Sequence, residues 1–447
     1  MVPIPGSKKR PLPDAKAIAA APRDERFEVT IRLRPRTPLP KAAVMLDPTA
    51  PRTPILSHDE FDQLHGADPK DIVKVRKFAE ANDLAIVRES VGRRSVIVSG
   101  TVEDFNKAFD VQLKTYATPN RTYRGRVGPV RIPKQLADIV EGVFGLDNRP
   151  VAKRRGAATR HGTPLTTDGA HPFNPDEIAK LYNFPVDVDG SGQTIGIIEL
   201  GGGFRPEDLQ TYFAKLGLPT PKVIPVSVDG ASNAPSTADS DDGEVVLDIE
   251  VASAVAPGAK IVVYFSTNDR ASDGFLDAIT KAVHDSENNP SVISISWGGS
   301  EDPSSTGFQE QFDQVLQEAA LLGITVCVAA GDDGAADIGP KGWDGKPHVD
   351  FPASSPFALA CGGTRLLAKG SGSATATESI WNQHAADLRD GQFGSFGSGG
   401  GGVSDAFARP AYQNSANVPP SPARANFAGR GVPDVTGDGD PDSGYNI

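Results

Sequence analysis

Residues 241–255 have the sequence Asp241-Asp242-Gly243-Glu244-Val245-Val246-Leu247-Asp248-Ile249-Glu250-Val251-Ala252-Ser253-Ala254-Val255. The apolar spacing of Val245, Ile249 and Ala252 predicts a helix that is buried around its acidic positions. Glu244 and Asp248 are four residues apart, so a helix places both carboxyl groups on one face. Two carboxyl groups held together near an interior have pKa values that are pushed apart, and one becomes a candidate acid or base. The same residues also suit a solvated helix N-terminus, where acidic side chains favour the helix dipole.

The segments around this helix alternate between apolar strands and helices. Continuous apolar strands that alternate with helices are typical of a parallel sheet whose two faces are covered. The pattern therefore predicts an α/β fold, a parallel sheet with helices on both faces. The predicted strands are 194–200, 222–228, 260–265, 291–296 and 325–330, and the predicted helices, besides the acidic one, are 206–216, 274–285 and 307–322.

Polar and Gly-rich residues follow three of these strands, at 199–203, 296–299 and 331–334. Ligands of parallel sheets bind at the carboxyl ends of the strands, so these segments and the acidic helix predict one shared site. The run Gly201-Gly202-Gly203 also invites a dinucleotide-binding interpretation. It lacks the G-x-G-x-x-G spacing, and no helix start follows it directly, which argues against that interpretation.

The first third of the chain has a different pattern. Residues 1–26 are rich in Pro, Lys and Ala and are predicted to be flexible, whereas 27–148 interleave short strands and capped helices. This interleaving predicts a compact α+β domain with antiparallel strands. Its predicted strands are 27–33, 84–87, 95–98, 111–116 and 121–127. Its predicted helices are 71–82, 101–109, 133–144 and one that opens at a capping box from Ser57 to Glu60.

Residues 149–172 separate this domain from the second one, 173–447. They contain Lys153-Arg154-Arg155-Gly156 and few apolar side chains, which predicts an exposed basic linker of the kind that proteases cut. The charge changes sign at the same place. Residues 1–165 carry 30 Lys and Arg against 19 Asp and Glu, a balance of +11. Residues 166–447 carry 15 against 38, a balance of −23, and the two give the net charge of −12. We expect the two parts to attract each other, less so as carboxylates become protonated at low pH.

Composition excludes several classes of function. Nucleic acid is a poor partner for the acidic part, and the basic part lacks the interleaved aromatic residues that would favour RNA. No apolar stretch is long enough to span a membrane, and no conventional signal peptide is visible in residues 1–26. The two cysteines, Cys327 and Cys361, lie in apolar strand-like runs and are expected to be buried small hydrophobes rather than a disulfide or a metal site.

Eight motifs in register resemble the sedolisin family of serine-carboxyl peptidases, in particular its kumamolisin branch. The first domain also resembles a sedolisin prodomain at its end, Gly142-Val143-Phe144-Gly145-Leu146-Asp147. The resemblance implies a subtilisin-like domain over 173–447, preceded by an activating and inhibitory prodomain over 27–148 with a maturation site in the linker. The motifs are Ile197-Ile198-Glu199-Leu200-Gly201-Gly202-Gly203, Asp242-Gly243-Glu244 with Asp248, Ile295-Ser296-Trp297-Gly298-Gly299, Ala329-Ala330-Gly331-Asp332, Phe351-Pro352-Ala353-Ser354-Ser355-Pro356, Ala360-Cys361-Gly362-Gly363-Thr364, Gly400-Gly401-Gly402-Val403-Ser404 and Gly431-Val432-Pro433-Asp434-Val435.

The resemblance implies roles for three acidic residues. Glu244 matches the glutamate that replaces the histidine of the usual triad, and Asp248 matches the carboxylate that orients and charges it. A carboxylate base works at low pH, where histidine is already protonated. Asp332 matches the residue that stabilises the oxyanion, and it must be protonated to donate that hydrogen bond. Its residue type and position suit a simple turn equally well.

Further positions match the family pattern less specifically. Ser296, Trp297 and Gly298 match the edge that binds the backbone of protein or peptide substrates as an added strand. Trp297 also suits core packing. Glu199 resembles a supporting carboxylate of the same network, although a strand-end salt bridge would use the same residue. The family has a serine where this chain has Asp333, a departure that the sequence does not explain.

The nucleophile of the family is a serine in a Gly-Thr-Ser loop, and no Gly-Thr-Ser occurs in residues 1–447. The calcium ligands of the family are likewise expected beyond residue 447, and we interpret Asp438, Asp440 and Asp442 as a polar turn because they lack the completion of an EF-hand loop. We therefore expect a precursor of a secreted, acid-acting endopeptidase, with this polypeptide inactive alone. The alternative is a catalytically dead peptide-binding or decoy protein that retains the groove.

Overall fold

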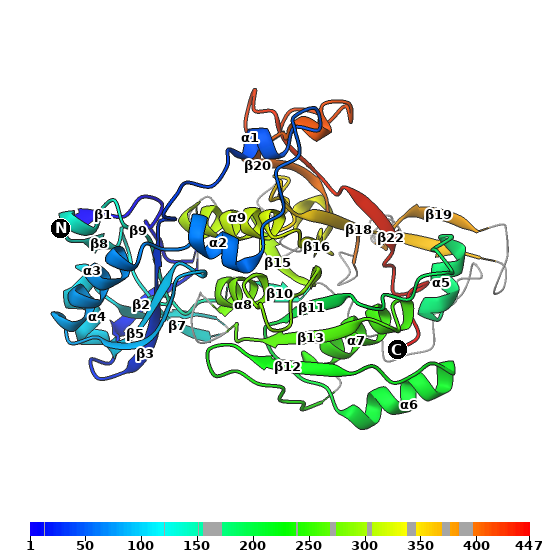
Figure 1. The fold of residues 1–447 in the computed structure, drawn as a ribbon, viewed down its shortest axis with the longest axis horizontal. Coiled ribbons are helices and arrows are strands. Elements are labelled where there is room, and N and C mark those ends of the chain that lie inside the picture. Colours follow the sequence, from blue (N-terminus) through cyan, green and yellow to red (C-terminus); the bar gives the residue numbers. More distant parts are fainter. Residues whose placement is uncertain are drawn as a thin grey trace.

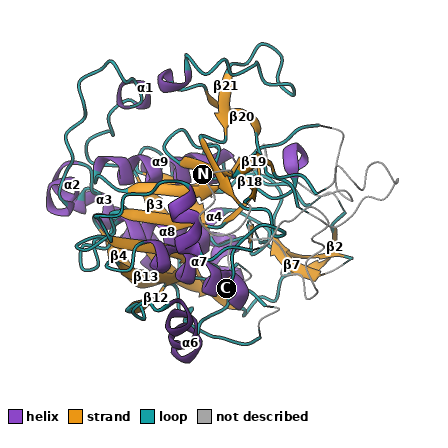
Figure 2. Cartoon of the chain, turned by 90° about the vertical axis from the view of Figure 1, so that its right-hand side faces the viewer, coloured by secondary structure: helices purple, strands orange, loops and turns teal. Residues whose placement is uncertain are grey.

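The chain forms two packed domains, blue to cyan and green to red in Figure 1. The computed structural model describes residues 1–12, 14–119, 121–150, 152–154, 172–237, 240–268, 274–301, 306–337, 346–368, 376–383 and 397–447. The first domain contains the elements up to β9, and the second contains those from α5 (Pro175–Leu181) onward. The short helix α1 (Ala42–Met45) of the first domain lies at the opposite end of the molecule from α6 (Pro206–Leu216) of the second (Figures 1 and 2).

The first domain is built on a four-stranded antiparallel sheet with the order β4-β5-β3-β9. Its strands are β3 (Arg26–Leu33), β4 (Ala85–Ser90), β5 (Ser95–Thr101) and β9 (Val140–Phe144). The helices α3 (Pro69–Glu80) and α4 (Val102–Phe109) bury their apolar side chains in one cluster with this sheet. The capping box at Ser57 is confirmed at the start of α2 (His58–Leu64), since it satisfies backbone N–H groups of the first turn.

Two sequence predictions for this domain are wrong. Residues 1–26 contain β1 (Val2–Pro3), which pairs with β8 (Arg131–Ile132), and β2 (Lys16–Ala20), which pairs with β6 (Lys114–Thr118) of the β6–β7 (Arg121–Gly125) hairpin. Composition cannot reveal such pairing, because the partner strands lie about a hundred residues away. The predicted helix 133–144 is a 3₁₀ turn, Lys134–Leu136, followed by strand β9. Pairing of β9 with β3 overrides the local helical pattern.

The second domain has a sheet with the order β12-β13-β11-β14-β16-β18-β19, and β22 pairs with β18. All these pairs are parallel except that of β19 with β18, which confirms the predicted α/β class. The strands are β11 (Thr194–Glu199), β12 (Val223–Ser227), β13 (Lys260–Phe265), β14 (Val292–Ile295), β16 (Thr325–Ala329), β18 (Leu359–Leu367), β19 (Thr377–Ile380) and β22 (Val435–Asp438). A separate pair is formed by β20 (Gly402–Ala408) and β21 (Gly429–Val432).

Helices cover both faces of this sheet. The apolar side chains of α6 and α7 (Asp242–Val255) pack with β11 and β13 in one cluster. Those of α8 (Gly274–Val283) and α9 (Thr306–Leu321) pack in another, with side chains that point to the opposite face of the same strands. The helices that the structure describes include none that is long and apolar enough to cross a membrane.

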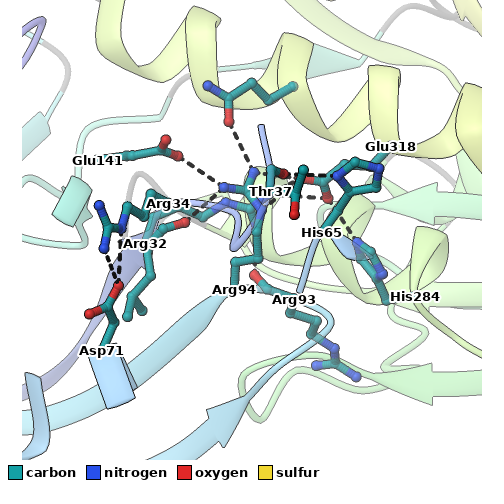
Figure 3. A network of polar contacts seen from close by, with 12 residues as sticks. Arg32, Arg34, Thr37, His65, Asp71, Arg93, Arg94, Glu141, His284 and Glu318 are labelled. Carbon is teal, nitrogen blue, oxygen red and sulfur yellow. Dashed lines mark hydrogen bonds and ion pairs between the residues drawn. The ribbon is translucent and has the colours of Figure 1, made fainter. Parts of the chain in front are cut away.

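The domains meet through a buried polar network (Figure 3). Arg32 of β3 and Arg94, which precedes β5, both bind Glu318 of α9, with N–O distances of 3.1 and 2.5 Å. His284, which follows α8, shares the same carboxylate at 2.8 Å. Phe61 of α2 packs against the His284 ring. Charged groups from both domains are therefore desolvated together at this interface.

Candidate active site

Helix α7 carries the two predicted carboxyl groups at its N-terminal end. Val245 and Ile249 are fully buried against β11 and β13, which fixes the rotation of the helix. Glu244 and Asp248 each precede one of these core residues by one position and line a cavity beside the sheet. The i,i+4 spacing therefore acts as predicted: one helical face presents both carboxyl groups to the same space.

This cavity has a volume of about 680 Å³ and also contains Asp332, from the loop after β16. The three predicted catalytic carboxyl groups thus converge, although Asp332 lies 84 positions after Asp248 in the printed sequence. The other walls come from α7, the Gly-rich part of β18 and the end of the chain; they include Leu247, Val251, Ser294, Gly362, Gly363, Trp381, Tyr445 and Ile447.

Electrostatics favour the protonated forms of these carboxyl groups. Burial raises the pKa of Glu244, and the charges of Asp248 and Asp332 raise it further, while Arg154 opposes the shift. Burial also raises the pKa of Asp248 to about 6, although the hydrogen bond from Ser296 favours its ionised form. Burial and the charges of Asp248 and Glu244 together raise the pKa of Glu199. The cluster therefore keeps protons at pH values where isolated carboxyl groups have lost them.

Ser296, Trp297 and Glu199 support the α7 carboxyl groups. The Ser296 hydroxyl donates to Asp248, with distances of 2.9 Å to both carboxylate oxygens. The Trp297 indole is buried, and its Nε1 donates to Oε2 of Glu199 at 3.0 Å. Glu199 is fully buried, and no described residue forms a hydrogen bond with its Oε1 or pairs with it as a salt bridge. The side chains of Ser296 and Trp297 thus donate hydrogen bonds to carboxyl groups. The sequence had assigned these two residues to the edge that binds the substrate backbone.

Backbone hydrogen bonds from Ser398 and Gly400 hold the turn that carries Asp332. The Ser398 amide donates to the Asp332 carbonyl at 2.8 Å, and the Gly400 amide donates to the Gly331 carbonyl at 2.7 Å. Gly331 has a φ of +108°, a conformation that residues with a Cβ rarely adopt. Asp332 therefore occupies a turn and also borders the cavity, so the two interpretations of this residue are compatible.

The linker lies at the mouth of this site as an added strand. β10 (Lys153–Arg154) pairs antiparallel with β15 (Trp297–Ser300), with Lys153 opposite Gly298 and Arg154 opposite Trp297. The Arg154 side chain lines the cavity and donates to the Ser240 carbonyl at 2.8 Å. The predicted edge, Trp297 and Gly298, thus binds a backbone in the structure, and that backbone belongs to the same chain.

Sequence reasoning missed the contributions of Lys153, Arg154 and Asp438 to this region. The opposite charge of the linker and the second domain was the signal available for the first two. Asp438 also lines the cavity, and burial raises its pKa to about 7. Its carboxyl group reaches the cavity because β22 pairs with β18. A pairing of this kind cannot be inferred from the local sequence.

The acidic side chains near residue 440 contact protein groups of the second domain. Asp438 Oδ1 accepts from the Leu366 amide and the Ser443 hydroxyl, at 3.1 and 2.9 Å. Asp440 and Asp442 both face Arg365, at 3.4 and 3.7 Å. Within the described ranges there is no group of three or more His, Cys, Asp or Glu that could hold a metal ion. Oδ2 of Asp438 is buried and has no hydrogen-bond partner among the described residues.

Comparisons with known proteins agree with this architecture. Residues 13–149 match the activation domain of pro-kumamolisin, and residues 231–441 match the subtilase family. Kumamolisin from Bacillus sp. (strain MN-32) is 44% identical over 99% of this chain and 79% of its own length. Tripeptidyl-peptidase sed5 from Aspergillus fumigatus is 30% identical over 98% of this chain and 79% of its own length.

A solved structure of Pseudomonas sedolisin, complexed with pseudo-iodotyrostatin, superimposes with a TM-score of 0.52 at 26% identity. The superposition covers 62% of this chain and 73% of that one. The chain belongs to the sedolisin family of serine-carboxyl peptidases and carries the activation domain of a proenzyme.

Proposed function

We propose that this chain is the precursor of an acid-acting endopeptidase. Glu244 is the general base, Asp248 orients and charges it, and Asp332 donates a hydrogen bond to the oxyanion that develops on the peptide carbonyl. The observation that carries the proposal is that one cavity, at the carboxyl ends of the strands, holds all three carboxyl groups. Family membership supplies the reaction class, in which a serine attacks the peptide bond and forms an acyl-enzyme.

The raised pKa of Glu244 suits this role. A base is most effective when its pKa lies near the working pH, and a buried glutamate reaches this condition in acid. Activity falls at lower pH, as Glu244 becomes protonated and can no longer accept the proton of the nucleophile. Activity also falls at higher pH, since an ionised Asp332 has no proton to donate. The expected profile is therefore a bell with its maximum in acid.

The linker supplies inhibition in the precursor. β10 occupies the edge of β15 that a substrate backbone needs, and Arg154 lies against the cavity that contains Glu244. A second strand cannot pair with the same edge, so substrates are excluded while the linker stays bound. Maturation is a cut within residues 149–172 that releases this strand.

In this proposal, acid also weakens the association between the two domains. The −23 balance of residues 166–447 falls as carboxylates become protonated, whereas the basic residues of 1–165 keep their charge. Activation in acid is consistent with action in an acidic extracellular setting. The affinity of the separated domains, measured from pH 7 to pH 4, is expected to fall; equal affinity at both ends would contradict this step.

Residues 1–447 contain no Gly-Thr-Ser loop. Among the described residues the serine that lines the cavity is Ser294, which lies within strand β14 rather than in a loop at its end. A polypeptide of residues 1–447 alone is therefore expected not to hydrolyse peptides, and to bind them only when they displace the linker from β15. Peptide binding without catalysis is the second candidate function, favoured by the β15 edge, which binds a backbone strand without any nucleophile.

A chimera tests the proposal. Residues 1–447 are fused to the Gly-Thr-Ser segment of Bacillus kumamolisin and the residues that follow it, and hydrolysis of fluorogenic peptides is measured from pH 3 to pH 8. The chimera is expected to turn over peptides in acid, and residues 1–447 alone are not. Asp332→Ala, which removes the donor, should lower kcat by about 100- to 1000-fold. Glu244→Gln should abolish turnover, as should replacement of the added serine by alanine.

Cooperative thermal unfolding of each chimera shows that it is folded. Turnover that is highest at neutral pH, or that is unchanged in Asp332→Ala, would contradict the assignment of the carboxyl groups. Hydrolysis by residues 1–447 alone would reveal a nucleophile elsewhere in the chain. Peptide binding by a folded chimera that never hydrolyses would favour the second candidate function.

A further inference from the structure

Asp333 lies next to the proposed oxyanion residue and contacts the bound linker. Its Oδ2 accepts from the Lys153 ammonium at 2.5 Å. The same ammonium donates to the Asp337 carbonyl at 3.3 Å. Both partners stay accessible, with 48% of the Lys153 side chain and 30% of the Asp333 side chain exposed. The contact is therefore open to solvent and is not a buried structural pair.

The backbone fixes where the lysine side chain starts. Lys153 is paired with Gly298 of β15, and Ala152 accepts a hydrogen bond from the Asn268 side chain. Any peptide that pairs with β15 in this register places one residue opposite Gly298. A long cationic side chain at that position reaches both the Asp333 carboxylate and the Asp337 carbonyl. A short or neutral side chain reaches neither.

The carboxylate is also held in place before a peptide arrives. Asp333 forms an isolated parallel bridge with Ser398, and the Gly334 amide donates to the Ser398 carbonyl at 3.0 Å. The turn that presents Asp333 is thus tied to a neighbouring segment. A preorganised acceptor loses little conformational entropy when its cation binds.

We infer that Asp333 makes the enzyme select peptides with lysine or arginine at the position that pairs with Gly298. The inference rests on the proposed function, because it requires that substrates take the place of the linker on β15. A half-exposed ion pair contributes roughly 1 kcal/mol, which corresponds to about a fivefold preference.

Hydrogen exchange in the intact chain tests the contact without any need for catalysis. Exchange of the amides of residues 152–154 is followed by mass spectrometry. Lys153→Gln and Asp333→Ser are each expected to speed exchange about fivefold. The double variant should exchange no faster than either single one, and Lys153→Arg should keep most of the protection. Asp229→Ser, which removes a different carboxylate between the domains, is the matched control and should leave these amides unchanged.

Two results would overturn the inference at this stage. One is an Asp333→Ser variant whose linker exchanges like that of the unmodified chain. The other is a double variant whose exchange is faster by the product of the two single effects, since independent effects mean that the two side chains do not act on each other.

Peptide substrates then test the selection itself. A series with Lys, Arg, Gln or Glu at the position opposite Gly298 is assayed with the active chimera. Lys and Arg peptides should have a kcat/KM about fivefold above Gln, and Asp333→Ser should remove the difference. An active chimera with no charge preference overturns the inference and leaves the proposed function intact. An inactive chimera whose linker still depends on Asp333 contradicts the proposed function and supports the contact.

Discussion

Two buried groups of carboxylic acids in this molecule respond to burial in opposite directions. In and beside the cavity, burial and the charges of neighbouring carboxyl groups raise the pKa values of Glu244 and Glu199. At the domain interface, Glu318 is just as inaccessible, yet Arg94 and Arg32 hold its pKa well below the usual range (Figure 3). Desolvation opposes ionisation in both places, and two guanidinium groups reverse the outcome in one. The cavity is thus suited to exchanging protons, and the interface to fixed charge.

Removal of the interface carboxylate should have the largest effect on stability. Glu318→Gln leaves Arg32 buried without its anion and Arg94 with Glu141 as its remaining anionic partner. The loss of one partner from a buried ion pair costs about 3–5 kcal/mol. We expect a comparable fall in the free energy of unfolding, measured by urea titration at pH 7.

The matched control is Glu103→Gln, which removes the anion of the exposed Arg23–Glu103 pair, whose side chains are 79% and 59% exposed. This variant should change stability by less than about 1 kcal/mol. Equal losses in the two variants would mean that burial does not decide the strength of these pairs.

Glu250 is a buried carboxyl group that pairs with no guanidinium group of the described residues, and so it sharpens the comparison. Burial raises its pKa to about 8, Lys215 opposes this shift and Asp208 adds to it. Because the folded pKa exceeds the unfolded one, stability is full in acid and is lost as the pH rises from about 4.5 toward 8. The free energy of unfolding of Glu250→Gln should therefore exceed that of the unmodified chain by about 1–2 kcal/mol at pH 7.5 and equal it at pH 4.

The pH series itself provides the check on this prediction. Urea titrations of both proteins at pH 4, 6 and 7.5 give the difference in free energy at each pH. Glu207→Gln, at an exposed position in the first turn of α6, is the control and should give no such trend. A Glu250→Gln gain of the same size at every pH would show that packing, not ionisation, is responsible.

His284 tests whether the interface itself senses acid. Burial lowers the pKa of this imidazole, Arg32 lowers it further, and Glu318 opposes both. As the pH falls, the His284 imidazole is therefore protonated at a higher pH in the unfolded chain than in the folded one. The free energy of unfolding decreases as the pH falls below about 6.5. Gln at this position keeps a donor for Glu318 without taking up a proton.

His284→Gln should thus reduce the loss of stability between pH 6.5 and pH 5 by about 1 kcal/mol. Thermal midpoints measured across this range provide the test. His65→Gln is the control, because His65 bonds a backbone carbonyl of its own domain rather than Glu318. An unchanged pH slope in His284→Gln would place the acid response elsewhere.

The parts of the site that were predictable from sequence are those set by local geometry. Glu244 and Asp248 were identified because an i,i+4 spacing fixes two side chains within one helix. The strand ends near Glu199 and Asp332 followed from the rule for parallel sheets. Strand pairing between distant segments was not readable, and this accounts for the wrong helix at 133–144 and for the unexpected strands in residues 1–26.

The same limit applies to the interface and the cleft. Arg32 and Glu318 are far apart in the chain, and Arg32 sits in an alternating strand whose pattern predicts solvent on one face. Opposite net charges predicted that the two domains attract each other, but not which charges become buried. The sequence predicted a basic linker at residues 149–172, whereas the register of Lys153 and Arg154 on β15 required the structure.

The smallest effect is expected from the pair formed by Arg88 and Asp229, which also joins the two domains. Its atoms are 3.4 Å apart, and the side chains are 43% and 26% exposed. Solvent screens such a pair, so a double-mutant cycle with Arg88→Gln and Asp229→Ser should give a coupling of less than about 1 kcal/mol. The coupling should shrink further in 1 M salt, where charges more than about 3 Å apart are screened.

The Arg32–Glu318 pair joins the same two domains with the same chemistry but without solvent, and its coupling should resist salt. Equal salt sensitivity of the two pairs would show that contact between the domains, rather than exclusion of water, determines how firmly an ion pair joins them.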